Sequence, residues 1–134
     1  MNDPFSSYIR GEFSVSYMSG PMDGHTVYFR EPEAGDQIVV TMGRRESCDI
    51  PLDYDNQSSR IHARLGCASK AITSSGEDHK QNFILTFWLE DNGSRNGTFI
   101  EKTEEAIDGR VTLRPGTFFR IGRTWLRLDA PLSF

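Results

Sequence analysis

The apolar and polar residues of this chain alternate in short runs. Residues 13–18, FSVSYM, place an apolar side chain at every second position, which is typical of a β-strand with one buried face. Similar segments, rich in β-branched and aromatic residues, recur along the chain and are separated by turn residues. The expected strands cover residues 13–18, 26–29, 37–42, 49–52, 61–66, 83–89, 98–100, 110–113, 118–121 and 125–128. About ten short strands with regular turns predict an all-β sandwich.

Two of these strands carry an expectation about their place in a sheet. Pro51 has no amide hydrogen to donate, so the short strand at 49–52 should lie at a sheet edge. Residues 83–89, FILTFWL, form a nearly continuous apolar run, which predicts a strand buried on both faces.

Two connections can also be predicted. Residues 68–82 are rich in Ser, Lys and Gly, and we expect a mobile hairpin loop there, within which a strand could start near Ile72. Gly122 and Arg123 separate two apolar segments and predict a two-residue hairpin turn.

The length of 134 residues fits one domain, which we expect to span residues 12–130 between tails at 1–11 and 131–134. No run of eighteen apolar residues and no secretory signal pattern is present in the sequence. Cys48 and Cys67 lack metal-ligand spacing, so we expect buried free thiols in a reducing compartment and neither a metal nor another cofactor. The expected location is therefore cytoplasmic, or nuclear if the source is eukaryotic.

The charge balance argues against a nucleic-acid partner. The chain has 15 Lys and Arg against 19 Asp and Glu, a net charge of -4, and shows no basic stripe. Its positive charge is local, and a small cationic pocket on an acidic body suits a single phosphate group better than a duplex. The local charges are Arg44 and Arg45, Arg60 and Arg64, and Arg95.

Five polar residues suited to binding a phosphate fall on three expected loops. Arginine presents a planar fork of donors that matches two phosphate oxygens, and a serine hydroxyl adds another donor. Asparagine donates and accepts at once, so it can hold a passing peptide backbone. The candidates are Arg44 on the first loop, Ser59 and Arg60 on the second, and Arg95 and Asn96 on the third.

Each candidate taken alone has a plainer interpretation. Asn96 with Gly97 is a strong turn signal by itself, and Ser59 could cap a loop without binding a ligand. Arg45 is expected to be a solvated surface residue. His62 follows the strand alternation and is expected to be a hydrogen-bonded structural residue rather than a base.

The order and spacing of these residues resemble the forkhead-associated (FHA) domain signature, which has a Gly-Arg, a Ser-x-x-His and an Asn-Gly-Thr. Two supporting segments also resemble the family, and the match runs from about Phe13 to Leu128. The matching segments are Gly43-Arg44, Ser47 to Leu52, Ser59-Arg60-Ile61-His62, Asn92 to Thr98, and Leu113 to Gly122. The resemblance implies a β-sandwich of about eleven mostly antiparallel strands, with its binding loops at one end.

The resemblance also implies a role for each candidate. Arg44 and Ser59 would contact the phosphate of a phosphothreonine, and Arg60 would reach the phosphate or the adjoining peptide backbone. Asn96 would hold the peptide main chain. Arg95 stands where many members have a threonine that touches the phosphate. Gly43, His62 and Gly97 would support the loops, with His62 joining them through hydrogen bonds.

The expected function is therefore phosphothreonine-peptide binding in signalling by a Ser/Thr kinase that phosphorylates the partner. We expect no membrane partner. A phosphate-independent interaction or homo-oligomerisation module on the same fold is the alternative. An enzyme is disfavoured, because Ser59 and His62 should not face each other and no nucleophile elbow is present. Gln57 lies on the loop that often reads the third residue after the phosphothreonine, and its neutral side chain argues weakly against a demand for an acidic residue there.

Overall fold

The computed structural model describes residues 11–73 and 81–130, and ten strands but no helix lie in these ranges. The strands are β1 (Glu12–Tyr17), β2 (Thr26–Arg30), β3 (Gln37–Gly43), β4 (Ile50–Pro51), β5 (Ala63–Thr73), β6 (Gln81–Asp91), β7 (Thr98–Ile100), β8 (Arg110–Leu113), β9 (Phe118–Ile121) and β10 (Thr124–Asp129).

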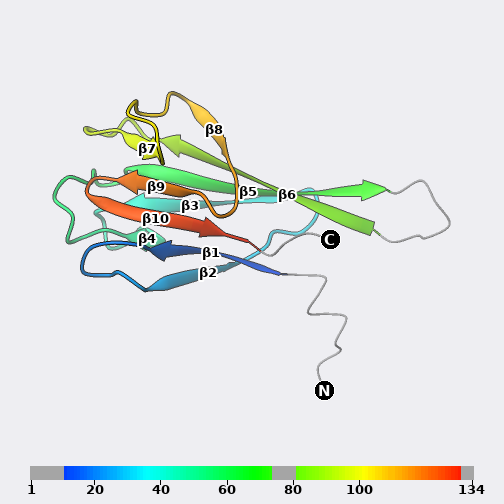
Figure 1. The fold of residues 1–134 in the computed structure, drawn as a ribbon. Coiled ribbons are helices and arrows are strands. Elements are labelled where there is room, and N and C mark those ends of the chain that lie inside the picture. Colours follow the sequence, from blue (N-terminus) through cyan, green and yellow to red (C-terminus); the bar gives the residue numbers. More distant parts are fainter. Residues whose placement is uncertain (1–10, 74–80, 131–134) are drawn as a thin grey trace, which may run out of the picture.

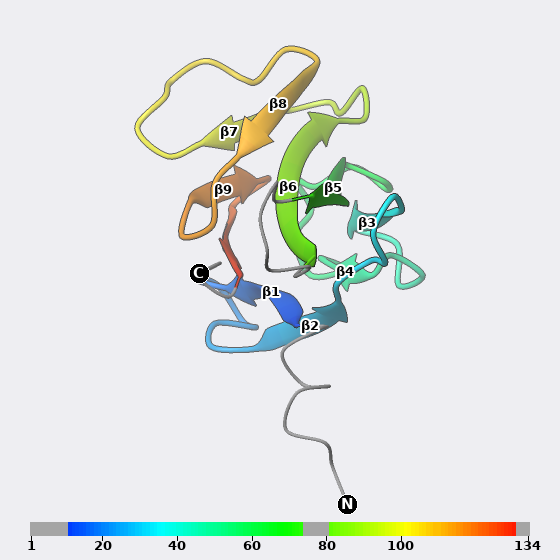
Figure 2. The ribbon, with the colours of Figure 1, turned by 90° about the vertical axis from the view of Figure 1, so that its right-hand side faces the viewer.

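The strands form two five-stranded sheets, in the orders β2-β1-β10-β9-β7 and β4-β3-β5-β6-β8. The pairing of β3 with β4 is parallel, and the other strand pairs are antiparallel. Figure 1 shows the strands lying along one direction, and Figure 2 shows the two layers from the ends of the strands. The all-β sandwich predicted from the sequence is confirmed.

The core lies between the inner faces of the two sheets. Phe13, Val15 and Tyr17 alternate along β1 and are at most 1% exposed, as the period of two predicts for the core face. Ser14 and Ser16 on the other face are also buried, at 9% and 7% exposed, so the prediction of a single buried face for this strand is wrong. The ring of Phe13 meets Phe87 of the opposite sheet edge-on, with 5.3 Å between the ring centroids. This contact ties the two layers together near the middle of the sandwich.

Both cysteines are free and buried, in agreement with the expectation from the sequence. Burial raises the pKa of Cys67 to about 12, so this thiol stays protonated at neutral pH.

The prediction of a loop at residues 68–82 is wrong over most of its length. β5 continues to Thr73 and β6 already starts at Gln81, and these two residues are paired across the strands. A polar composition does not end a strand whose backbone groups find partners on the neighbouring strand. Residues 74–80 lie outside the described residues.

The prediction that residues 83–89 are buried on both faces is also wrong. Phe87 and Leu89 are buried in the core, but Ile84, on the outer face, is 45% exposed. Trp88, also on the outer face, lies over Gly66, where a Cβ atom would come within 1.9 Å of the indole. The guanidinium of Arg110 covers the ring at 3.6 Å. On the outer face of β6, Trp88 is thus covered by neighbouring residues, whereas Ile84 stays exposed.

Two local predictions are confirmed. β4, which contains Pro51, lies at the edge of its sheet. Gly122 and Arg123 form the two-residue turn between β9 and β10, where Ile121 pairs with Thr124. Gly122 has a φ of 59°, a left-handed conformation that glycine adopts without strain.

Candidate functional site

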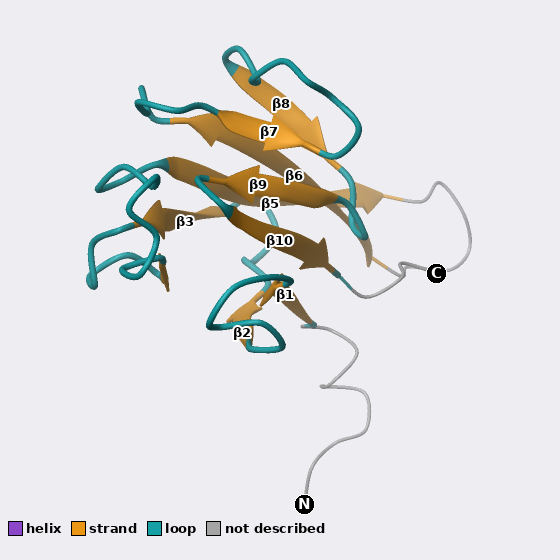
Figure 3. Ribbon diagram, turned by 60° about the vertical axis from the view of Figure 1, so that its left-hand side comes forward, coloured by secondary structure: helices purple, strands orange, loops and turns teal. Residues whose placement is uncertain are grey.

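The loops with the candidate residues meet at one end of the sandwich, where the teal connections gather in Figure 3. Arg44, after β3, donates its backbone N–H to the carbonyl of Ser59 at 3.0 Å. Arg45 donates its backbone N–H to the carbonyl of Arg60 at 3.1 Å. Two loops that are separate in the sequence therefore run side by side, which puts Arg44 beside Ser59 and Arg45 beside Arg60.

Gly43 makes this close approach sterically feasible. A Cβ atom at this position would lie 2.3 Å from the carbonyl oxygen of Arg60 and 2.8 Å from the backbone nitrogen of His62. Such distances are far below van der Waals contact, so only glycine allows the end of β3 to lie against the second loop.

His62 joins the second and third loops from inside. Its ring is fully buried, and its Nδ1 accepts a hydrogen bond from the backbone N–H of Ser59 at 2.9 Å. Because Nδ1 accepts, the ring proton lies on Nε2, which donates to the carbonyl of Gly97 at 2.7 Å. Both ring nitrogens are therefore used, and the imidazole is a neutral link between the loops.

Ser59 lies at the centre of these contacts. Its Oγ accepts a hydrogen bond from the backbone N–H of Arg95 at 3.0 Å, which brings the third loop to the second. Its own hydroxyl proton has no acceptor among the residues that the structure describes. The hydroxyl of Ser59 can therefore still donate to a ligand.

The side chains of Arg44, Arg60 and Arg95 are exposed at this end. Within residues 11–73 and 81–130, none of these three guanidinium groups has a hydrogen-bond or ion-pair partner. A shallow depression of about 450 Å³ is lined by Arg44, Arg45, Ser59, Arg60, Ile61 and Asn92. By contrast, the protein engages the guanidinium groups of Arg64, Arg110, Arg120 and Arg127. The loop end therefore presents free, fixed-charge donors to an oxyanion.

Asn96 connects the third loop to the second in a way that the sequence did not indicate. Its side-chain Nδ2 donates to the backbone carbonyl of Gln57 at 2.9 Å and to the side-chain Oε1 of Gln57 at 3.0 Å. Both amide hydrogens are thus occupied, and Oδ1 is the atom left to accept from a peptide N–H. Gly97 follows with a φ of 83°, so the Asn-Gly pair also serves the turn.

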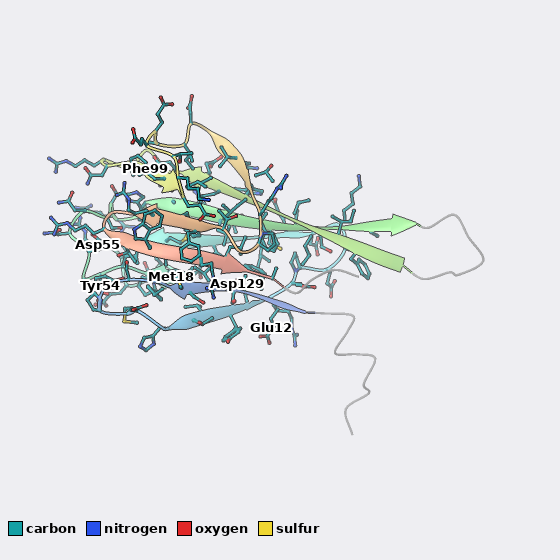
Figure 4. All side chains as sticks on the ribbon, viewed as in Figure 1. Glu12, Met18, Tyr54, Asp55, Phe99 and Asp129 are labelled. Carbon is teal, nitrogen blue, oxygen red and sulfur yellow. The ribbon has the colours of Figure 1, made fainter. Side chains whose placement is uncertain are left out.

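Asp55 was missed in the sequence analysis and holds the second loop in place. Its carboxylate is 4% exposed and accepts from the backbone N–H of Gln57 at 3.0 Å and of Arg123 at 2.8 Å. It also accepts from the hydroxyl of Thr124 at 2.7 Å. Figure 4 labels Asp55 and its neighbour Tyr54 at the loop end. The contact with Gln57, two residues on, is an Asx-turn that the sequence could have suggested, but the contacts with the β9–β10 turn carry no sequence signal.

Asp91, a second residue missed in the sequence analysis, organises the third loop. Its carboxylate accepts from the backbone N–H of Ser94 at 2.8 Å and from the hydroxyl of Thr98 at 2.7 Å, and it lies 3.9 Å from Nε2 of His62. Burial raises the pKa of Asp91, but hydrogen bonds from Ser94 and Thr98 outweigh burial, so the pKa lies below its usual 3.8.

This lowered pKa predicts a dependence of stability on acid. Near pH 4, Asp91 is protonated less often in the folded state than in the unfolded state. The stabilisation by Asp91 is therefore fully present above the pKa that this carboxyl has in the unfolded chain. It is lost as the pH falls through the pKa of Asp91 in the folded protein. Thermal unfolding of the protein and of Asp91→Asn, from pH 7 to pH 2, measures this effect. The stability difference between them should be constant near neutral pH and shrink below about pH 4. A difference independent of pH would contradict the role of Asp91, and Asp53→Asn, an exposed neighbour of Asp55, is the control.

The described ranges, residues 11–73 and 81–130, hold neither a membrane-spanning helix nor a cluster of metal-ligating side chains. No helix there is long and apolar enough to cross a membrane. No group of three or more His, Cys, Asp and Glu side chains there is arranged to hold a metal ion.

Two packed five-stranded sheets with polar loops converging at one end make this chain a β-sandwich domain. The FHA domain family model matches residues 40–122, well over half of the sequence. The chain therefore belongs to the FHA domain family, as the resemblance implied.

Solved FHA domain structures share this fold. The FHA domain of the CT664 protein from Chlamydia trachomatis is 22% identical, with a TM-score of 0.64, over 91% of this chain and 100% of that chain. The MEK1 FHA domain, in complex with a phosphothreonine peptide of HOP1, is 18% identical, with a TM-score of 0.58, over 87% of this chain and 94% of that one. The FhaA FHA domain, in complex with the intracellular domain of Rv3910, is 20% identical, with a TM-score of 0.58, over 87% of this chain and 99% of that chain. A search of the curated proteins finds no match to this sequence.

Proposed function

We propose that this chain is a phosphothreonine-peptide-binding module that mediates phosphorylation-dependent protein interactions in Ser/Thr kinase signalling. The observation that carries the proposal is the convergence of Arg44, Ser59 and Arg60, with Arg95 reaching Ser59 from the third loop. Hydrogen bonds of the backbone fix the main chain at these residues. The guanidinium groups of the three arginines have no partner among the described residues.

The electrostatics of a phosphate group suit these donors. A phosphothreonine carries about -1.5 to -2 charges at neutral pH and three strong acceptor oxygens. Hydrogen bonds to a charged group contribute roughly 1.5–3 kcal/mol each, against about 0.5–1.5 kcal/mol for neutral ones. The hydroxyl of Ser59 and the guanidinium groups of Arg44 and Arg95 would bind the phosphate, and Arg60 would reach the phosphate or the adjoining peptide backbone. Oδ1 of Asn96 would accept from the peptide main chain.

Family relatives support this proposal. The related MEK1 domain binds a phosphothreonine peptide, and the family match includes Gly43, Arg44, Ser59, His62 and Asn96 within its residues. The partner would be a protein phosphorylated by a Ser/Thr kinase, inside the cell, with no role for nucleic acid or a membrane.

The proposed activity is binding without catalysis. Oγ of Ser59 accepts from Arg95, and the ring of His62 contacts the backbone of Ser59 and not its hydroxyl. Nε2 of His62 is committed to Gly97. The two residues therefore do not form the nucleophile and base pair that a hydrolase requires.

Replacing Arg44 tests the proposed phosphate contact. Arg44→Ala should weaken binding of a phosphothreonine peptide at least tenfold, since losing one charge-assisted hydrogen bond of about 1.4 kcal/mol or more costs a decade in affinity. Arg44→Lys keeps the charge but loses the planar fork of donors, so its affinity should fall between that of the unchanged protein and that of Arg44→Ala. Titration calorimetry with a peptide selected from an oriented phosphothreonine library measures both effects.

The controls separate phosphate recognition from a general interaction. Arg114→Ala removes an exposed arginine on the β8–β9 turn and should leave the affinity unchanged. The peptide without its phosphate should bind poorly or not at all. Equal binding before and after phosphatase treatment would instead support the phosphate-independent module, for which Tyr28 (66% exposed) and Val39 (42%) offer apolar surface.

A further inference from the structure

The loop end carries more positive charge than one phosphate group needs. Arg44, Arg45, Arg60 and Arg95 are all exposed there, and together they contribute four positive charges. A phosphothreonine supplies at most about two negative charges. About two positive charges therefore remain without a counter-ion when a singly phosphorylated peptide is bound.

The protein itself does not neutralise this surplus. Glu90 is engaged by Arg110 at 3.2 Å. Asp55 accepts hydrogen bonds from Gln57 and Arg123, and Asp91 accepts one from Ser94. Glu46, the sequence neighbour of Arg45, forms no ion pair within the described residues. Like charges gathered at one place create a local positive potential that attracts anionic ligands.

Arg45 lies at a definite place relative to the phosphate contacts. Its backbone is bound to that of Arg60, one residue beyond the pairing of Arg44 with Ser59. One depression is lined by Arg44, Arg45, Ser59 and Arg60 together with Ile61 and Asn92, and Arg95 is not among its lining residues. Arg45 and Arg60 therefore line the same depression as Arg44 and Ser59, the residues placed at the first phosphate.

Asn92 also lines the depression and does not neutralise its charge. Its Oδ1 accepts from Arg64, and its Nδ2 donates to the carbonyl of Ile61 at 3.1 Å. Neither Asn92 nor Ile61 presents a negative group to Arg45. The depression is thus lined by cationic and neutral groups, and none of its lining residues carries a negative charge.

We propose that Arg45, together with Arg60, forms a second anion subsite, so that the preferred ligand carries a second phosphate or carboxylate close to its phosphothreonine. This inference rests on the proposed function, because it places the first phosphate at Arg44 and Ser59. The shared chemistry is an oxyanion, which arginine binds through two parallel hydrogen bonds. A carboxylate offers one charge and a second phosphate up to two, so the phosphate should give the larger gain.

The experiment compares peptides that differ only in the second anion. One selected phosphothreonine peptide is made in three forms at each of the three positions on either side of the phosphothreonine: with a neutral residue, with glutamate, and with phosphoserine. At one position at least, the phosphoserine form should bind at least tenfold more tightly than the neutral form, with the glutamate form between them. A phosphoserine placed beyond the sixth flanking residue measures non-specific attraction and should give little gain.

Variants identify the residue responsible for the gain. Arg45→Gln should reduce the affinity ratio of the doubly to the singly phosphorylated peptide from at least tenfold toward one. Arg44→Gln should weaken both peptides by a similar factor and leave that ratio largely intact. Arg114→Gln, the matched control, removes an exposed positive charge elsewhere and should change neither affinity.

The outcomes separate the two proposals. If the singly phosphorylated peptide binds and a second anion adds nothing at any position, the second subsite is wrong and the proposed function stands. The second subsite is equally wrong if the gain persists in Arg45→Gln. If no phosphorylated peptide binds better than its unphosphorylated form, both proposals are wrong.

Discussion

Replacing Asp55 with alanine should lower the free energy of unfolding by about 3 kcal/mol, because the buried carboxylate satisfies three donors at once. The backbone N–H groups of Gln57 and Arg123 and the hydroxyl of Thr124 would lose their acceptor together. Arg123 lies in the β9–β10 turn and Thr124 is the first residue of β10, so the substitution also releases the second loop from this part of the chain. Chemical denaturation monitored by tryptophan fluorescence measures the change.

The same substitution should also weaken phosphopeptide binding. Asp55 fixes Gln57, and Gln57 in turn receives both amide hydrogens of Asn96. Loss of this chain of contacts should loosen the second and third loops, and we expect affinity to fall several-fold even at temperatures where the protein stays folded. Asp53→Ala, which removes an exposed carboxylate from the same loop, is the matched control. If Asp55→Ala is no less stable than Asp53→Ala, the positioning role assigned to Asp55 is wrong.

Gly43→Ala should be comparably damaging, for a steric reason. The added methyl group would lie 2.3 Å from the carbonyl oxygen of Arg60. This atom belongs to the backbone, so no side-chain rotation relieves the clash. The end of β3 would have to separate from the second loop, which breaks the hydrogen bond from Arg44 to Ser59. Overpacking that shifts backbone costs about 1–3 kcal/mol and occasionally more, and we expect the upper end here.

Because Arg44 and Ser59 move apart, Gly43→Ala should also reduce phosphopeptide affinity at least tenfold. Gly35→Ala provides the comparison, since its added methyl group meets no atom within 4 Å while its φ of +88° disfavours alanine. That variant should lose about 1–2 kcal/mol from backbone strain alone and keep its phosphopeptide affinity. Equal affinity losses in both variants would show that general destabilisation, and not the loop contact, is responsible.

Much of the fold followed from local features of the sequence. The alternation in residues 13–18 identified the core face of β1, and Pro51 identified an edge strand, because each property depends on a residue and its near neighbours. Apolar content alone misled at residues 83–89. Whether the second face of a strand is covered depends on neighbours such as Gly66 and Arg110, which are distant in the sequence.

The candidate site divides in the same way. The sequence supplied the residue types and their order, and the structure brings Arg44, Ser59, Arg60 and Asn96 onto adjoining loops, although their contacts with a peptide stay a prediction. The buried acceptor Asp55 was missed, because two of its three partners lie more than sixty residues away along the chain.

The sequence by itself determined that this protein is an all-β member of the FHA family, with arginines, a serine and an asparagine on three loops. Turn residues, strand alternation and motif spacing are local properties, so they can be read along one chain. Only the tertiary structure decided which groups are free to meet a ligand. In the folded protein, the ring of His62 and both amide hydrogens of Asn96 are hydrogen-bonded to neighbouring loops. The guanidinium groups of Arg44 and Arg45 have no internal partner among the described residues. Hydrogen-bonding capacity is shared between segments that meet only on folding, and for that reason it could not be assigned before the loops were in place.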